Sequence, residues 1–452
     1  MDVINFISKV PGLPDAAITR KDQAYQWGSK YFACGPRLHE HLLAMGKILK
    51  EYNAFSVGEM PCVQDPKEIL NAVAFDRGEL NMIFHFEIVE LDIGDRGKFS
   101  PRQWQMSRLK EVINNWQTFM INNDGWNALY LENHDQSRSV SRWGSDAPEF
   151  RVICAKMFAT FLTLQSGTLF VYQGQELGMV NIPKTRPVSE YKDLETLNAW
   201  NETLEKYPDD KEWQRITNEE IWRKSRDNAR TPMQWDTTPH AGFSTTTPWQ
   251  KENESYTTIN ASSQVNAKDS VFSYWASILR LRKSHEIFIY GDFELVDAEH
   301  EDVFAYKRSF EGKGVLIVAN FRKEVVKWIV PKGVLLVKEK VLTKNYENGA
   351  ESPKYQATRS SVREDAHQKL HPTANVNDCW AAKPLKYNVS DLDVARVAPN
   401  ADGPAEEPLE SSDEEDDDEE SASGEVGGDD EGSMYVDEEG AASDVSKVTE
   451  AF

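Results

Sequence analysis

The stretch WNALYLENHD, residues 126–135, is a short apolar run that ends in polar and charged residues. A second stretch, AFSVGEMP at 54–61, has the same form and ends in Glu59, with Pro61 close behind. Two further apolar runs, LNMIFHFE at 80–87 and TLFVY at 168–172, complete a set of four. Short runs of apolar, β-branched and aromatic residues between turn residues predict β-strands, here at 54–58, 80–87, 126–131 and 168–172.

Amphipathic helices are expected between these strands. Apolar side chains recur with a helical period from Leu38 to Tyr52 and from Phe150 to Leu162. Ser100 followed by Pro101 predicts the start of another helix, which continues through Trp116. Alternating strands and helices predict an α/β fold built on a parallel sheet. Because a closed (β/α)8 TIM barrel needs eight strands, we expect its C-terminal half, strands 4 to 8 if a strand ends at Asp2.

The pattern of polar and apolar residues changes along the chain and divides it into three parts. Residues 1–290 form the partial barrel; within them, residues 179–267 show little periodicity and predict a long loop, and Asp269–Lys283 predicts a helix. Residues 291–345 alternate polar and apolar positions and predict a small antiparallel β-sandwich, with a hairpin at Gly312 and Gly314. Its expected strands lie at 293–297, 303–309, 314–321, 327–330 and 334–338. Residues 346–452 predict a largely disordered tail outside both domains.

Charge and cysteine content exclude several classes of function. Of the net charge of −23, −20 falls in residues 401–452, so the remainder is close to neutral and offers no basic face for nucleic acid. The four cysteines lie far apart, without the spacing of a zinc site or a disulfide framework, which predicts reduced thiols in a cytoplasmic protein. No apolar stretch approaches the roughly 18 residues that predict a membrane span, and no secretory signal is recognisable. We therefore expect no nucleic-acid or membrane partner.

Three carboxylates, Asp2, Glu59 and Asp135, each follow a position where a strand should end. Taken singly, Glu59 and Asp135 are equally well explained as structural ion-pair partners. Taken together, they would face one barrel mouth, because the catalytic groups of such barrels stand at the C-terminal ends of the strands. Two carboxyl groups in that position, one ionised and one protonated, are what retaining glycoside hydrolysis requires.

Several motifs in order resemble the α-glucosidase, isomaltase and oligo-1,6-glucosidase branch of the α-amylase superfamily, glycoside hydrolase family 13. The resemblance runs from residue 1 to about 340. It rests on DVINFISK (2–9), SVGEMP (56–61), LENHDQSRSVSRW (131–143), GTLFVYQGQELGM (167–179) and SRDNARTPMQWD (225–236). It implies a retaining exo-acting α-glucosidase that hydrolyses terminal α-1,6 or α-1,4 bonds of small oligosaccharides, as isomaltases and maltases do, without a cofactor. It also implies a cytoplasmic monomer.

The resemblance assigns a role to six residues. Asp2 is the nucleophile, Glu59 the general acid and base, and Asp135 the carboxylate that stabilises the transition state. His134 and Arg230 bind the glucose at the cleaved bond, although a buried imidazole that only orients Asp135 and an arginine in a structural ion pair remain alternatives. Val3 lines the pocket for the second sugar and favours α-1,6 cleavage, with simple packing against the barrel wall as its alternative.

The sequence also departs from the family pattern. The segment that precedes the nucleophile, the first three strands, the domain inserted after the third and the usual metal loop have no counterpart, and Leu169 replaces a proline. A structural divalent ion would belong to that missing region. Because an open half-barrel leaves strand edges unpaired, we expect the chain as given to be a weak enzyme or inactive. A start site placed too late and a catalytically silent relic, acting as a scaffold through its acidic tail, are the two explanations. A sugar isomerase of the same superfamily also remains open.

Overall fold

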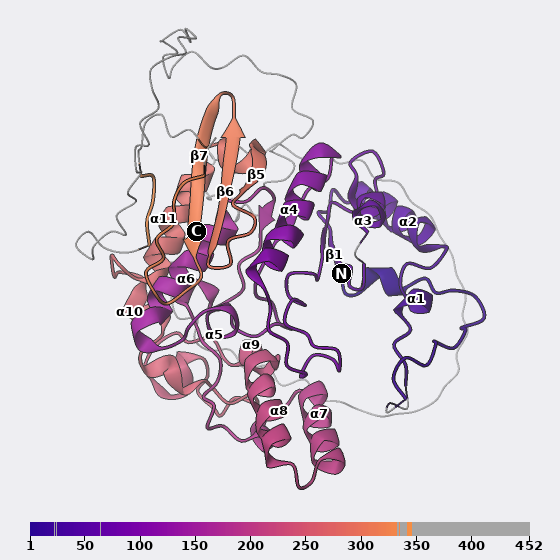
Figure 1. The fold of residues 1–452 in the computed structure, drawn as a ribbon, viewed down its shortest axis with the longest axis vertical. Coiled ribbons are helices and arrows are strands. Elements are labelled where there is room, and N and C mark those ends of the chain that lie inside the picture. Colours follow the sequence, from indigo (N-terminus) through magenta and orange to yellow (C-terminus); the bar gives the residue numbers. More distant parts are fainter. Residues whose placement is uncertain (22, 24, 64, 332–333, 335–340, 346–452) are drawn as a thin grey trace, which may run out of the picture. The chain divides into compact units, whose positions relative to one another are not determined.

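The computed structural model describes residues 1–21, 23, 25–63, 65–331, 334 and 341–345, and the fold below is that of these residues (Figure 1). All of them belong to the first of two compact units, Met1–Lys386. The expected acidic tail, Cys379 and most of the strand at 334–338 lie outside the described residues.

Four short strands lie where the four apolar runs predicted them. They are β1 (Val57–Glu59), β2 (Met82–Phe84), β3 (Ala128–Leu129) and β4 (Thr168–Leu169). β1 pairs with β2 and β3 pairs with β4, both in parallel. The aromatic rings of Phe84 and Tyr130, with centroids 5.0 Å apart, connect the two pairs. The prediction of parallel strands is confirmed, but each ladder is only two or three residues long.

Helices follow the strands in the expected βα order. A 3-10 turn, η1 (Ile4–Phe6), and the short α1 (Ser29–Phe32) precede α2 (Leu38–Glu51), and α3 (Pro66–Val73) follows β1. After β2 comes α4 (Met106–Asn122), and after β3 come α5 (Ser139–Trp143) and α6 (Pro148–Thr163). The predictions for α2 and α6 are therefore confirmed. Asp65 caps α3 by accepting the amide of Lys67 at 2.9 Å, with Pro66 in the first turn.

The start of α4 is wrong in the sequence prediction, because the helix begins at Met106 and not after Ser100. The carboxylate of Glu301 accepts the amides of Met106 and Ser107 at 3.0 and 3.1 Å. A negative charge at a helix N-terminus satisfies its unpaired amides and opposes the positive end of the helix dipole. The cap comes from a residue almost two hundred positions away, so a local capping signal could not locate it.

Residues 179–267 are not the structureless loop that we predicted. They contain two long helices, α7 (Leu194–Lys206) and α8 (Lys211–Lys224), which form a hairpin (Figure 1). Asp193 and Asp210 cap them by accepting the amides of Thr196 and Trp213. Their surfaces carry ion pairs three and four residues apart, such as Arg215 with Glu212 and Glu219. Such pairs support helices whose apolar stripe is too narrow to give a clear period.

Short elements complete this region and lead to the last helices. The short elements are η2 (Gln175–Leu177), η3 (Val188–Glu190), α9 (Asp227–Arg230), η4 (Pro239–Gly242), η5 (Glu254–Thr257) and α10 (Ala261–Gln264), and the last helices are α11 (Val271–Lys283) and α12 (Ile287–Tyr290). The prediction of a helix at Asp269–Lys283 is confirmed by α11, whose start is capped by Ser270.

A three-stranded antiparallel sheet follows, made of β5 (Asp292–Val296), β6 (Val303–Phe310) and β7 (Lys313–Asn320) in that order. The hairpin between β6 and β7 turns at Glu311 and Gly312, which have φ of 49° and 75°, as a two-residue turn with left-handed residues requires. The prediction of a strand at 327–330 is wrong, because these described residues do not form a strand. In the described part of the chain, β5–β7 are a single sheet, and the second layer of a sandwich is not among its elements.

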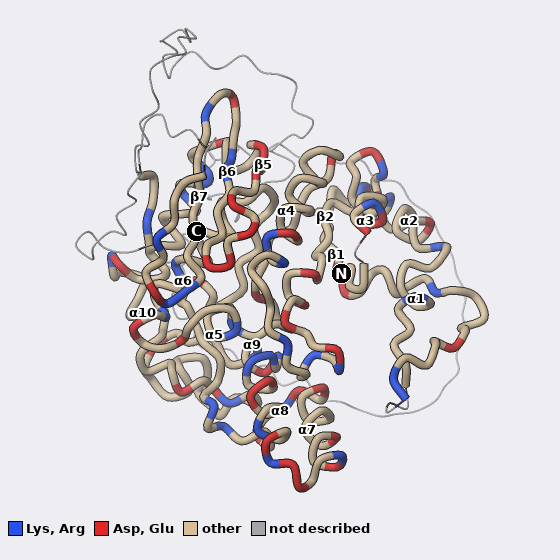
Figure 2. Tube along the Cα trace, in the orientation of Figure 1, with Lys and Arg blue, Asp and Glu red and all other residues tan. Residues whose placement is uncertain are grey.

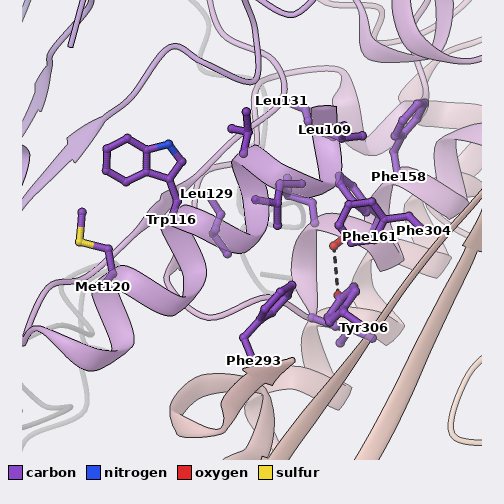
Figure 3. Packing of buried hydrophobic residues seen from close by; sticks show 14 of the residues in the cluster. Leu109, Trp116, Met120, Leu129, Leu131, Phe158, Phe161, Phe293, Phe304 and Tyr306 are labelled. Atoms are coloured by element: carbon purple, nitrogen blue, oxygen red, sulfur yellow. Dashed lines mark hydrogen bonds between the residues drawn. The ribbon is translucent and has the colours of Figure 1, made fainter. Parts of the chain in front are cut away.

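One apolar core joins this sheet to the α/β part. In Figure 3, Trp116 and Met120 of α4, Phe158 and Phe161 of α6, and side chains from β5 and β6 pack together. The hydroxyl of Tyr306 donates to the carbonyl of Phe161 at 3.2 Å.

Two buried arginines reinforce this junction. Arg282 donates to the carbonyls of Thr163, Gln165, Gly167 and Phe288, and Arg308 donates to those of Leu164, Phe288, Gly291 and Asp292. Their charges thus lie among carbonyl groups at the C-terminal end of α6, which favours cations.

Figure 2 shows lysine and arginine interspersed with aspartate and glutamate over the described residues. None of the helices found there has the length and apolar character needed to cross a membrane.

Candidate active site

Asp2 lies beside Glu59 because the first residue of the chain pairs with β1. The nitrogen of Met1 donates to the carbonyl of Val57 at 2.8 Å, and the amide of Glu59 donates to the carbonyl of Met1 at 2.9 Å. These are the two hydrogen bonds that a residue makes with a parallel neighbour. Asp2 and Glu59 therefore lie next to each other, at the C-terminal ends of two parallel, hydrogen-bonded segments.

The surroundings of Glu59 raise its pKa. Burial is the largest cause, and the Asp2 carboxylate adds to it through a hydrogen bond and its negative charge. His134 opposes the rise and Asp135 increases it, so both groups are near enough to act on Glu59. A carboxyl group held protonated beside a second carboxylate is suited to be a general acid.

Val3 has a strained backbone, with φ 32° and ψ 50°, in the left-handed region that a β-branched residue rarely adopts. The strain turns the chain so that Ile4, which is 3% exposed, packs on β1. Gly58 permits this approach, because a Cβ atom there would lie 2.8 Å from Ile4 Cδ1. Such strain costs of the order of 1–3 kcal/mol and concentrates at functional sites.

Two arginines hold Asp135. Its Oδ1 atom lies 2.6 Å from Arg230 Nη2 and 3.3 Å from Arg226 Nη1, and His134 Nε2 is 3.6 Å away. Arg230 also donates through Nε to the carbonyl of His134 at 3.0 Å. The structure thus places Arg230 in an ion pair with Asp135, and His134, whose side chain is 61% exposed, is not the buried imidazole of the alternative.

Buried ion pairs that the sequence analysis missed support the loop after β3. Arg138 contacts Glu132 at 3.2 Å, and Glu132 also accepts the amide of Ser139 at 2.8 Å. Arg142 makes two hydrogen bonds to Asp92, at 2.6 and 3.0 Å. Glu132, Arg138 and Arg142 all belong to the stretch 131–143, but nothing in their spacing separates side chains that support the loop from those that face the site.

The carboxylates lie on an open face in the described part of the chain. Asp2 is exposed, and the side chains of Asp135 and Arg230 are each 32% exposed. Two cavities in this part lie in the apolar interior, one of them between β3 and helices α4 and α6, and neither is lined by Asp2, Glu59 or Asp135.

Glu90 is a second carboxyl group whose pKa is raised, to about 7, mainly by burial and further by the charge of Glu87. In the unfolded chain its pKa is about 4.3, so the folded state binds the proton more tightly. The contribution of this group to stability is therefore complete below about pH 4 and is lost as the pH rises through 7.

We expect Glu90→Gln to remove this pH dependence. Relative to the wild type, the free energy of unfolding of the variant should rise by about 2–3 kcal/mol between pH 5 and pH 8. Denaturant unfolding at both pH values measures it, with Glu149→Gln on the surface as the control. An equal difference at both pH values would contradict the assigned shift.

Comparisons with known proteins identify the relatives of this chain. The family model described as the α-amylase catalytic domain matches residues 1–291. An α-glucosidase of Schizosaccharomyces pombe is 41% identical over 352 residues, which cover 77% of this chain and 60% of that protein. An oligo-1,6-glucosidase of Parageobacillus thermoglucosidasius is 40% identical over 348 residues, with the same two coverages.

A solved structure, the trehalose-6-phosphate hydrolase of Bacillus licheniformis, superposes with a TM-score of 0.69 at 34% identity. The match covers 78% of this chain and 61% of that one. The chain thus spans about 60% of the length of these curated relatives. Since the family model matches well over half of its residues, this chain belongs to the α-amylase family, glycoside hydrolase family 13.

Proposed function

We propose that this chain carries the catalytic carboxylates of a retaining exo-acting α-glucosidase for small oligosaccharides with terminal α-1,6 or α-1,4 bonds. The observation that carries the proposal is the contact between Asp2 and the carboxyl group of Glu59, whose pKa is raised, with Asp135 near enough to Glu59 to act on it. Relatives named α-glucosidase and oligo-1,6-glucosidase support the choice of substrate.

The reaction has two steps. Glu59 donates its proton to the glycosidic oxygen while Asp2 attacks the anomeric carbon, so the leaving sugar departs with that proton and a glucosyl ester forms on Asp2. Glu59, now ionised, takes a proton from water, whose oxygen displaces Asp2 and releases glucose with retained configuration. Asp135 stabilises the positive charge that develops on the sugar ring, and Arg230 and His134 bind its hydroxyl groups.

The same proposal includes a fold that is half of a (β/α)8 barrel. The two parallel pairs among the described residues leave the ring of eight strands open. We therefore propose that efficient turnover needs polypeptide that supplies the other strands and closes the exposed face on which Asp2 lies.

Hydrolysis assays test the proposal. The 452-residue chain and a form extended at its N-terminus are compared with p-nitrophenyl α-glucoside, isomaltose, maltose and trehalose 6-phosphate as substrates. We expect the extended form to be the more active on the two glucosyl disaccharides, with α-glucose as the first product in an NMR time course. Inversion of configuration, or no hydrolysis of any substrate by either form, would contradict the proposed function.

Val3 provides a test of linkage preference. Exchange for the isosteric threonine adds one hydroxyl group beside Asp2, which an α-1,4-linked sugar can use as a hydrogen-bond partner. Such a contact is worth about 1 kcal/mol, so Val3→Thr should raise the ratio of kcat/KM for maltose to that for isomaltose about fivefold. Val3→Ala, which removes methyl groups without adding a hydroxyl, is the control. An unchanged ratio in Val3→Thr would leave Val3 with a packing role only.

A further inference from the structure

Arg226 connects Asp135 to the start of helix α7. Its Nη1 atom lies 3.3 Å from Asp135 Oδ1, its Nε atom 3.2 Å from Asp193 Oδ1, and its Nη2 atom 3.2 Å from Glu195 Oε2. The guanidinium group therefore lies among three carboxylates and makes a bridge through two hydrogen bonds, from Nη1 to Asp135 and from Nη2 to Glu195. A planar fork with several fixed donors suits such a bridge better than a lysine ammonium group.

The carboxylates on the far side of Arg226 are themselves fixed. Asp193, whose side chain is 7% exposed, caps α7 by accepting the amide and hydroxyl of Thr196 at 3.1 and 2.9 Å. Asp227 accepts the amide of Asp193 at 3.1 Å, which fastens the start of α7 to α9. Glu195 also accepts Lys98 at 3.1 Å, from the segment between β2 and α4. The contact of Arg226 with Asp135 is therefore supported by carboxylates that are themselves held in place.

Arg230 and Arg226 share one oxygen of Asp135. Both contact Oδ1, at 2.6 and 3.3 Å, and among the described side chains none forms a hydrogen bond or ion pair with Oδ2. A carboxylate held in this way presents its second oxygen in one orientation. Arg230 is expected to bind sugar and to change its contacts as substrate arrives, whereas Arg226 is tied to α7 and α9 and can hold Oδ1 throughout.

We infer that Arg226 is a positioning residue that couples helix α7 to Asp135 and fixes the orientation of this carboxylate in the transition state. The inference rests on the proposed function for its catalytic meaning, while the coupling itself can be tested without turnover.

The kinetic test compares Arg226→Met with Arg215→Met in the form of the protein that hydrolyses α-glucosides. Arg215 is a matched control, because it lies on α8 in ion pairs with two carboxylates at the surface. Misplacement of a catalytic group by a fraction of an ångström is expected to lower kcat by about 10–100-fold, with a change in KM of less than about threefold. Arg226→Lys should keep kcat nearly as low as Arg226→Met does. Guanidinium ion added to the assay should partly restore the kcat of Arg226→Ala.

A purely structural role predicts a different result. Arg226→Met would then lower the unfolding midpoint but keep kcat at a temperature where the variant is folded, and guanidinium ion would have no effect. That result would overturn the inference.

Hydrogen exchange tests the coupling independently of activity. In Asp135→Asn, the amides of Thr196 and Leu197 in the first turn of α7 should exchange several-fold faster than in the wild type, and those of α11 should not change. If the wild type hydrolyses no glucoside but this exchange does change, the proposed function fails and the coupling stands. Unchanged exchange at α7 would overturn the coupling.

Discussion

Replacing Asp2 with asparagine should lower kcat on p-nitrophenyl α-glucoside by about 10⁴-fold or more. The amide keeps the shape of the side chain but is too weak a nucleophile to form the glucosyl ester, and removal of the nucleophile from a covalent mechanism abolishes most of the rate enhancement. Asp2 also acts on Glu59 through a hydrogen bond and its charge, so the exchange should lower the pKa of Glu59 towards its ordinary value.

The control for this variant is Asp15→Asn, an exposed aspartate of the same N-terminal segment. Both variants are assayed in the form of the protein that is active, and their unfolding midpoints are compared with that of the wild type. If Asp2→Asn is folded and keeps more than a tenth of the wild-type kcat, Asp2 is not the nucleophile.

The second large effect is expected for Glu59→Gln and depends on the leaving group. Isomaltose needs a proton on its departing oxygen, so loss of the general acid should lower kcat/KM by about 10²–10⁴-fold. p-Nitrophenolate departs without that proton, so its kcat/KM should fall much less. Azide, which needs no general base, should attack the accumulated glucosyl ester and restore turnover as α-glucosyl azide.

The pH profile gives a further readout of the same variant. Because burial and Asp2 raise the pKa of Glu59, its protonated form persists above the range of an ordinary glutamate. The alkaline limb of kcat/KM for isomaltose should therefore lie above that range in the wild type and disappear in Glu59→Gln. Equal losses on both substrates and no effect of azide would show that Glu59 is not the acid and base. Glu51→Gln, at the exposed C-terminal end of α2, is the control.

The parts of the fold that were predictable from sequence have a strong local signal. The strands at β1–β4 are marked by dense apolar runs, and α2, α6 and α11 by a wide apolar stripe. The start of α4 was not predictable, because its cap is Glu301, which is distant in sequence. The helices α7 and α8 were missed because polar and charged residues dominate their surfaces, although Asp193 and Asp210 were visible as caps.

Some residues of the candidate site could likewise be predicted from the sequence, and Arg226 could not. Asp2, Glu59 and Asp135 could be found because each follows the end of an expected strand, and Arg230 and His134 because their motifs resemble a known family. Arg226 stands four residues before Arg230, and the sequence does not show which of the two arginines reaches Asp135. Both do, and Arg226 gains further contacts with Asp193 and Glu195 only because the fold brings the start of α7 beside it.

The most direct test of the account is to trap the glucosyl ester on Asp2. The active form of the protein is incubated with 5-fluoro-α-glucosyl fluoride, whose fluorine at C5 slows hydrolysis of the ester, and peptides from a digest are sequenced by mass spectrometry. We expect one fluoroglucosyl group on the peptide that contains Asp2, and less labelling when isomaltose is present. A label on another carboxylate, or turnover that follows inversion and leaves no label, would contradict it.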